Sequence, residues 1–393
     1  MNGKKTILLK TGWDTVNIGD IGHTPGTLRV LEEKLPDVRI IAWMGRMDDS
    51  IEAMLRRRFP KVSFITGRID GNADPDSSDL ADAFDQADLV IHNSSMGQDT
   101  TMMSAARKRG KAYGMFGQSY PPEIAEKADL IDLLNDARFV FCRDTLTLGT
   151  LRSIRLRTPV LDFNPDGCFG IDVRDDPPAR AFLSDRALEE HRYMTLQLRT
   201  NTQKHPGTDS PLNPANPTPE QRADDERRAA KLRDVMTGWI EQADCKVVIA
   251  PEVKKEIGHN KRLLIDPLPD AIRKNVVLRD QFWNADEAAS VFASARVVVC
   301  HEPHSCIIGL ANGTPSVHTY SPYHGPKYHM FADIGLKNWQ VPLDDQPADA
   351  ILKTLIDIHR NFDAARERVR DAMEFVDGRF SRAAATIKNV LES

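Results

Sequence analysis

The chain has 393 residues, of which 41% are hydrophobic and 28% charged, the balance of an ordinary globular protein. With 52 Lys and Arg against 57 Asp and Glu, the net charge is −5, which excludes the basic excess of a nucleic-acid-binding protein. At about 100–200 residues per domain, this length predicts two domains, or at most three.

The sequence predicts no integral membrane segment and no leader. A membrane span needs about 20 apolar residues, and the apolar runs here are short, such as Val297 to Cys300. The five cysteines form no CxxC motif. Their odd number predicts buried, reduced thiols and a cytoplasmic protein.

In the first half, short apolar runs alternate with helix-like stretches, which indicates a parallel α/β sheet. The expected strands are 6–9, 38–44, 62–65, 88–92, 111–116, 139–142 and 159–162. The expected helices are 24–33, 48–59, 80–86, 100–108, 122–135 and 145–152.

A stretch rich in Asp, Arg and Pro, residues 172–179, predicts a break, after which a second alternation begins. The expected strands are 194–198, 246–249, 275–278, 296–300 and 316–320, and the expected helices are 219–242, 286–294, 305–312, 350–360 and 362–375. We therefore expect domains at 1–175 and 190–360, followed by C-terminal helices at 361–393. The proline-rich stretch 201–220 is expected to be a mobile loop and a candidate lid.

Polar motifs follow several of the expected strands, where open α/β sheets bind ligands. The first, residues 12–20, contains Asn17 and ends in Asp20. Its backbone N–H groups are suited to an anion and Asp20 to a sugar hydroxyl. A tight turn with a helix cap is an equal alternative.

The second motif, residues 92–97, includes Asn93 and offers small polar groups to a ligand or caps the next helix. In the third, Arg143 precedes Asp144, an expected helix N-cap. Arg143 either binds a carboxylate or phosphate, or forms a structural pair with an aspartate.

The fourth motif is the densest, because five histidines fall between residues 301 and 329. His301 and His304 flank a proline in a turn, and no Cys/His set has a zinc spacing, so we expect no metal. One histidine is expected to act as an acid–base group and the others to be loop or core residues.

In their shared order, these motifs resemble the polysaccharide pyruvyl transferase family. The matching segments are Asn17-Ile18-Gly19-Asp20, Arg143-Asp144-Thr145, Val297 to His304, Gly313-Thr314-Pro315 and Lys327. The resemblance covers about residues 10 to 340. It implies two Rossmann-like domains in a GT-B-like arrangement, with the acceptor on the N-terminal domain and the donor on the C-terminal domain.

The resemblance also implies an activity, the transfer of the enolpyruvyl carbon of phosphoenolpyruvate onto a sugar diol as a ketal. It implies His304 as the catalytic residue. We expect Asn17 and Asp20 of the first motif and Asn93 of the second to bind the acceptor. The expected donor-binding residues are Arg143, Arg199, Glu302, Ser305 and Lys327. No cofactor is expected, and the question of a homo-oligomer stays open.

The sequence departs from the family pattern where Glu302 and Pro303 replace the Arg and Leu that precede the family histidine. A carboxylate would repel an anionic donor by about 4 kcal/mol per unit charge pair at 4 Å and an effective dielectric of 20. Arg199 is expected to compensate. Two alternatives remain, a GT-B glycosyltransferase that uses a nucleotide sugar and a catalytically silent sugar-binding protein.

Overall fold

The computed structural model describes residues 4–97, 99–200, 218–322 and 325–393. They form two compact units, each assembled from separated stretches of the sequence. Unit 1 comprises Met1–Thr15, Asp20–Asp172 and Glu374–Ser393, and unit 2 comprises Val16–Gly19 and Val173–Met373. The loop expected at 201–220 lies outside the described residues except for its last three.

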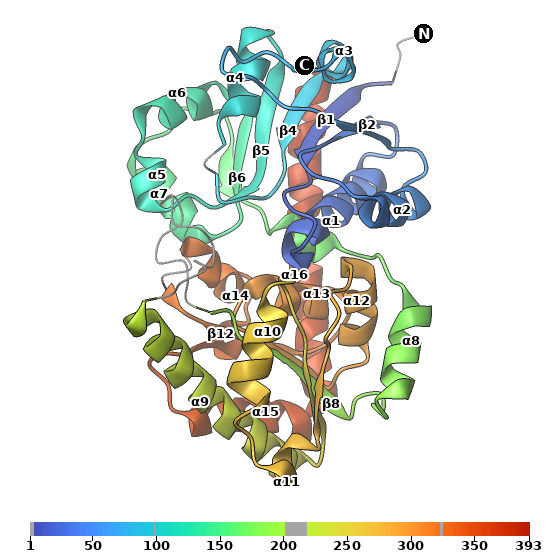
Figure 1. Cartoon of the computed structure of the whole chain (residues 1–393). Helices are drawn as coiled ribbons and strands as arrows, with labels where there is room; N and C mark the ends of the chain where they lie inside the picture. The colour runs from blue at the N-terminus through green and yellow to red at the C-terminus, as the bar shows by residue number, and fades with distance from the viewer. Residues whose placement is uncertain (1–3, 98, 201–217, 323–324) are drawn as a thin grey trace. The chain divides into compact units, whose positions relative to one another are not determined.

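Unit 1 is built on a sheet of seven parallel strands in the order β3-β2-β1-β4-β5-β6-β7 (Figure 1). The strands are β1 (Thr6–Thr11), β2 (Arg39–Met44), β3 (Ser63–Thr66), β4 (Leu89–His92), β5 (Ala112–Gln118), β6 (Phe139–Cys142) and β7 (Leu161–Phe163). The order reverses between β1 and β4, the position at which open α/β sheets bind ligands.

Helices connect the strands of unit 1. They are α1 (Ile18–Lys34), α2 (Asp49–Arg58), α3 (Ser78–Gln86), α4 (Thr101–Lys108), α5 (Pro122–Ala125), α6 (Ala128–Asp136) and α7 (Thr145–Ser153), with the 3₁₀ turn η1 (Gly167–Gly170) after β7. The second part of α16 (Phe362–Glu392) also belongs to this unit. There Phe380 is buried and stacks on Phe116 of β5, with 6.2 Å between ring centroids.

Unit 2 has a sheet of six parallel strands in the order β10-β9-β8-β11-β12-β13. They are β8 (Tyr193–Gln197), β9 (Lys246–Ile249), β10 (Val276–Leu278), β11 (Val297–Cys300), β12 (Ser316–Tyr320) and β13 (Gln340–Pro342). Its helices are α8 (Asp176–Asp185), α9 (Pro219–Ala243), α10 (Glu256–Asn260), α11 (Asp270–Arg273), α12 (Ala285–Ala293), α13 (Pro303–Ala311), α14 (Met330–Asp333), α15 (Ala348–Arg360) and the first part of α16.

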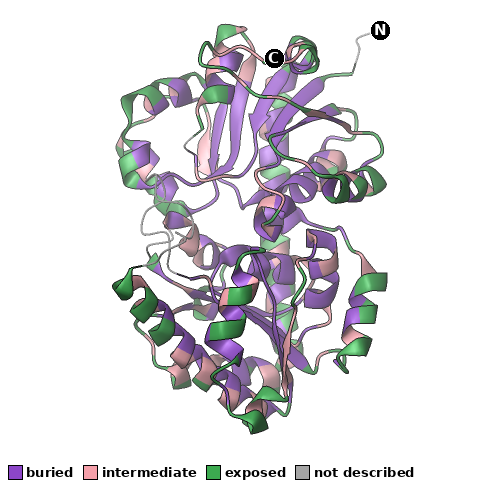
Figure 2. Ribbon diagram, in the orientation of Figure 1, coloured by how far each residue is buried: buried purple, intermediate pink, exposed green. Residues whose placement is uncertain are grey.

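The central strands of both sheets are buried (Figure 2). In β11 every residue is buried, and the same holds for β1, β4 and β8. Strands covered on both faces read as continuous apolar runs, which is why the sequence pattern located them. None of the helices in the described ranges is long and apolar enough to cross a membrane.

The elements differ from the sequence expectation in a few places. The stretch 172–179, expected as a break, contains the start of α8, whose two prolines lie in its first turn, where a helix tolerates them. Helix α1 begins at Ile18 rather than at residue 24, so the end of the first polar motif is already helical. The expected helix 122–135 is divided into α5 and α6.

Candidate functional site

The start of α13 in unit 2 is capped by a carboxylate from a distant part of the chain. Glu302 occupies the N-cap position but its side chain makes no capping bond. Instead, Oε2 of Glu252 accepts hydrogen bonds from the backbone N–H of Ser305, at 2.8 Å, and from its hydroxyl, at 2.7 Å. A helix start attracts an anion because its first N–H groups lack intrahelical partners. Here the chain supplies that anion itself, from a fully buried side chain.

His304 lies one position before Ser305 and is held on two sides. Its Nδ1 is 3.7 Å from Oε1 of Glu252 and 3.9 Å from Oε2 of Glu302. Gly19 closes another side, because a Cβ built on it would lie 2.6 Å from both Cβ and Cγ of His304. The ring is only 7% exposed. Its orientation is therefore fixed by packing and by two carboxylates.

The segment Val16–Gly19 reaches this site by pairing with residues of unit 2. Asn17 and Val253 form an antiparallel bridge, and the backbone N–H of Ile18 donates to the carbonyl of Glu252 at 3.0 Å. The side chain of Asn17 accepts a bond from the N–H of Gly19 at 2.9 Å. The two family motifs that contain Gly19 and His304 thus meet within one unit.

Glu302 is paired with two cations. Lys327 Nζ lies 2.7 Å from Oε2 of Glu302, and Arg199 Nε lies 3.5 Å from Oε1. Both cationic side chains are largely buried. The structure therefore brings together three of the expected donor-binding residues, and the carboxylate that replaces the family arginine is neutralised in place.

A second network fixes the backbone of Arg199. His301 Nδ1 bonds to the carbonyl of Arg199 at 3.0 Å, and its Nε2 lies 2.9 Å from Ser321 Oγ. Ser321 in turn donates to Asp344, which pairs with Arg228. Burial lowers the pKa of His301 to about 4. His301 is thus one of the buried core residues that the sequence analysis expected.

The same carboxylates have the geometry to hold a cation. Glu252, Glu302 and His304 are buried, and each offers one ligand atom, all within 4.8 Å of one another. Among the residues that the structure describes, Oε1 of Glu252 also has no hydrogen-bond partner. The ammonium of Lys327 already lies against Glu302, so a metal ion would have to displace it. The expected absence of a metal stays a prediction.

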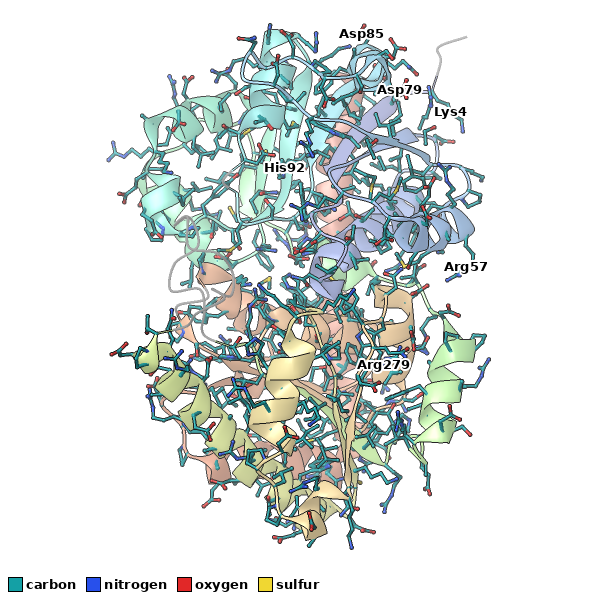
Figure 3. All side chains as sticks on the ribbon, viewed as in Figure 1. Lys4, Arg57, Asp79, Asp85, His92 and Arg279 are labelled. Atoms are coloured by element: carbon teal, nitrogen blue, oxygen red, sulfur yellow. The ribbon has the colours of Figure 1, made fainter. Side chains whose placement is uncertain are left out.

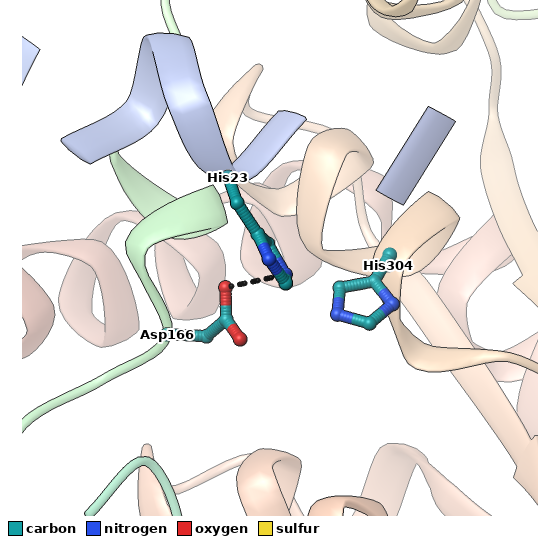
Figure 4. Close-up of side chains that lie close together, drawn as sticks. All are labelled: His23, Asp166 and His304. Carbon is teal, nitrogen blue, oxygen red and sulfur yellow. Dashed lines mark ion pairs between the residues drawn. The ribbon is translucent and has the colours of Figure 1, made fainter. Parts of the chain in front are cut away.

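Arg143 lies in unit 1, where it is 2% exposed and paired within the unit. Its Nη1 is 2.6 Å from Oδ2 of Asp166, and its Nε donates to Ser119 Oγ at 2.8 Å. His23 Nε2 lies 3.3 Å from the other oxygen of Asp166 (Figure 4). Arg143 thus has the structural pairing that the sequence analysis offered as an alternative, though with Asp166 and not with Asp144. Its role in donor binding stays a prediction.

Of the expected acceptor-binding residues, Asn93 is fully engaged by its own unit. Its amide donates to Thr11 Oγ1 and to the carbonyl of His23, both at 2.9 Å. Its oxygen accepts from Thr27 Oγ1 at 2.6 Å and from the N–H of Ser94 at 2.7 Å. Asn93 therefore ties β1, α1 and β4 together. Asp20 lies in the first turn of α1 and is partly exposed. Acceptor binding by either residue stays a prediction.

Sequence reasoning missed Glu252. The available signal was a carboxylate three residues beyond the expected strand 246–249, a position where open sheets place functional groups. It also passed over Lys10 and Trp13 in unit 1. Lys10 is a lysine within an apolar strand, and Trp13 lies inside the first polar motif.

Solved structures with the same fold cover almost the whole chain. UDP-GlcNAc 2-epimerase from Neisseria meningitidis, bound to UDP-GlcNAc, matches with a TM-score of 0.59 and 9% identity over 98% of this chain and 100% of that one. Medicago truncatula UGT71G1, complexed with UDP-glucose, matches with a TM-score of 0.54 and 10% identity over 100% of this chain and 98% of that one. ADP-heptose LPS heptosyltransferase II from Escherichia coli matches with a TM-score of 0.50 and 13% identity over 91% of this chain and 99% of that one. At these identities the likeness shows the fold alone.

The chain therefore has the two-unit α/β fold of the GT-B glycosyltransferases, as expected, with a buried histidine and carboxylate site in unit 2. A family model described as polysaccharide pyruvyl transferase matches residues 17–321. The chain belongs to the polysaccharide pyruvyl transferase family, which supports a transferase. No curated protein sequence matches it significantly.

Proposed function

We propose that this protein transfers a pyruvyl group from phosphoenolpyruvate to two hydroxyl groups of a carbohydrate, forming a cyclic ketal. The observation that carries the proposal is His304, held at the start of α13 between Glu252 and Glu302, with Lys327 and Arg199 paired to Glu302. Membership of the family supports the same chemistry.

In this reaction His304 is the acid. It gives a proton to the methylene carbon of the enol, which becomes a methyl group. One acceptor hydroxyl adds to the neighbouring carbon, the C–O bond to phosphate breaks, and the second hydroxyl closes the ketal. Inorganic phosphate leaves, and the two hydroxyl protons restore the acid and the protonation of the phosphate. Nδ1 of His304 lies 3.7 Å from Glu252 and 3.9 Å from Glu302, so both carboxylates hold the ring in place as a proton donor.

The donor's anionic groups bind at the two cations. In their ionised forms, the two cations Lys327 and Arg199 balance the two carboxylates Glu302 and Glu252, so the repulsion expected from Glu302 is offset. Guanidinium and ammonium groups in a water-poor site stabilise a leaving phosphate strongly. Unit 2 is thus the donor side in this proposal, and unit 1 is the acceptor side.

The experiment is a donor comparison on the purified chain. Thermal unfolding is measured with phosphoenolpyruvate and with a panel of nucleotide sugars. A ligand at about 100 times its dissociation constant adds roughly 2.7 kcal/mol. Phosphate release and product NMR are then followed with a panel of glycans in D₂O. We expect stabilisation by phosphoenolpyruvate, its loss in Lys327→Met, and one deuteron in the new methyl group.

His304→Gln serves as the catalytic control, because it should retain donor binding and lose phosphate release. Stabilisation by nucleotide sugars alone, with turnover of those donors, would contradict pyruvyl transfer and establish a glycosyltransferase. Binding of neither donor class would leave the proposal without a substrate and overturn it.

The compartment we propose is the cytoplasm. All five cysteines are free and buried, as reducing conditions would allow. Alkylation of free thiols during cell lysis, followed by denaturation and a count of the alkylated cysteines, checks this. Disulfide formation in the protein isolated from cells would contradict the proposal.

A further inference from the structure

The sheet of unit 1 has a second group of unusual side chains at its switch point. Lys10 is near the end of β1 and His92 ends β4, and the two residues are direct partners in the parallel pairing of these strands. Figure 3 labels His92 at this end of β4. Ligands of open α/β sheets bind beyond the carboxyl ends of strands where the strand order reverses.

Lys10 is a buried cation that lies against two indole rings. Its side chain is 7% exposed, and Nζ lies 4.1 Å from the ring centroid of Trp43 and 5.8 Å from that of Trp13. Within the described ranges, Nζ forms neither a hydrogen bond nor an ion pair. Burial lowers the pKa of Lys10 to about 8, while the charge of Asp99 raises it. Asp99 itself is bonded to the N–H and hydroxyl of Thr101.

His92 offers a free acceptor next to this cation. Its Nδ1 is 2.8 Å from the backbone carbonyl of Asn93, and because a carbonyl only accepts, Nδ1 carries the proton. Nε2 therefore has the lone pair, and it is buried with no hydrogen-bond partner in the part of the chain that the structure describes. Burial lowers the pKa of His92 to about 4, so the ring is neutral.

Trp13 provides an aromatic surface over both groups. Its ring stacks on His92 with 4.9 Å between centroids and 21° between planes, and its Nε1 donates to the carbonyl of Ser94 at 2.6 Å. The indole is only partly buried. A half-exposed indole with one anchored edge is suited to the apolar face of a sugar ring.

We propose that the ends of β1 and β4 form a saccharide subsite in which Lys10 binds an anionic group of the sugar and Nε2 of His92 accepts a bond from a sugar hydroxyl. Because a buried ammonium without an anion is costly, a ligand that brings a carboxylate or a phosphate is favoured over a neutral one. This inference rests on the proposed function and names the acceptor class as an anionic saccharide.

The test measures sugar binding in the absence of phosphoenolpyruvate. Saturation-transfer NMR titrations use methyl glucuronide, methyl glucoside 6-phosphate and methyl glucoside, which share one glucopyranoside ring. We expect one of the anionic sugars to bind more tightly than the neutral glucoside, by about tenfold, the value of one charged hydrogen bond. The anionic sugar that binds more tightly shows whether Lys10 binds a carboxylate or a phosphate.

Two variants separate the subsite from general effects. Lys10→Met should abolish the preference for the anionic sugar and leave methyl glucoside binding unchanged, whereas Lys10→Arg should retain the preference. Lys61→Met, on an exposed residue before β3, is the control for loss of a charge in unit 1. Thermal unfolding of each variant verifies that it folds.

Equal binding of the three sugars, no binding of any of them, or an anion preference that survives in Lys10→Met would each overturn the inference. The outcome is independent of the proposed chemistry, because no donor is present and His304→Gln should bind the sugars normally. Failure of pyruvyl transfer would appear instead as absent phosphate release with sugar binding intact.

Discussion

Gly19 and His304 are in contact although they are 285 positions apart in the sequence. The absence of a side chain at Gly19 is what allows the imidazole to lie against the backbone at this position. The contact explains in steric terms why a glycine belongs in the first motif, since any Cβ there would overlap the ring.

The first prediction is that Gly19→Ala displaces the His304 ring and reduces turnover more than donor binding. A misplaced acid loses rate steeply, and we expect kcat for phosphate release to fall by about 10- to 100-fold with KM for phosphoenolpyruvate nearly unchanged. Steady-state kinetics measure both. Gly149→Ala in α7 is the matched control, because no atom lies within 4 Å of its added Cβ. Equal effects of the two substitutions would contradict the steric argument.

The second prediction concerns the charge of Glu302. Glu302→Gln removes one negative charge from the group that contains Lys327 and Arg199, so phosphoenolpyruvate should bind more tightly, by about tenfold or more at low salt. Isothermal titration calorimetry measures the dissociation constant. Glu287→Gln in α12, which interrupts the ion pair of Glu287 with Arg279, is the control and should leave the affinity for phosphoenolpyruvate unchanged. Weaker binding in Glu302→Gln would show that Glu302 contributes to donor binding instead of limiting it.

At the scale of elements, the buried strands were predictable and the site partners were not. The expected strands end within two residues of those observed, because strands covered on both faces are continuous apolar runs. The role of Glu252 was not predictable, since its hydrogen bonds to Ser305 span 53 positions and depend on how β9 and β11 lie in the sheet. The pairing of Glu302 with Lys327 likewise depends on tertiary packing.

The third prediction concerns α10, which begins at a buried carboxyl. Glu256 accepts bonds from Gln197 Nε2 and from the N–H of Val253, and burial raises its pKa to about 7. The folded state therefore binds this proton more tightly than the unfolded chain does. Stability from this group is present below the unfolded pKa, near 4.5, and decreases as the pH rises to about 7.

Glu256→Gln should consequently stabilise the protein at pH 8, by up to about 3 kcal/mol, and have little effect at pH 5. The amide oxygen can accept the same two hydrogen bonds, so the substitution removes the ionisation alone. Chemical denaturation at the two pH values gives the comparison. A stabilisation that is the same at both pH values would contradict the assignment.

At the scale of the whole molecule, residues far apart in the sequence complete each unit. The fourth prediction tests this in unit 1. Phe380 is 1% exposed against Phe116, so Phe380→Ala should cost about 3–5 kcal/mol of unfolding free energy. Phe375→Ala is the control on the same helix, because Phe375 is 46% exposed. Thermal unfolding of the full chain compares the two variants. A similar small effect of both would mean that α16 contributes little to this unit.

The contribution of α16 to unit 1 has a consequence for protein synthesis. A ribosome that has finished residue 172 must translate all of residues 173–373 before the stretch that covers β5 exists. At about 5–20 residues per second, this interval lasts roughly 10–40 seconds. During that time the nascent unit 1 exposes the surface around Phe116 that Phe380 later buries, and transiently exposed apolar surface of this kind favours aggregation. In unit 2 the separate segment, Val16–Gly19, is synthesised before the rest of the unit. Folding of unit 2 therefore does not wait for a later stretch of the chain.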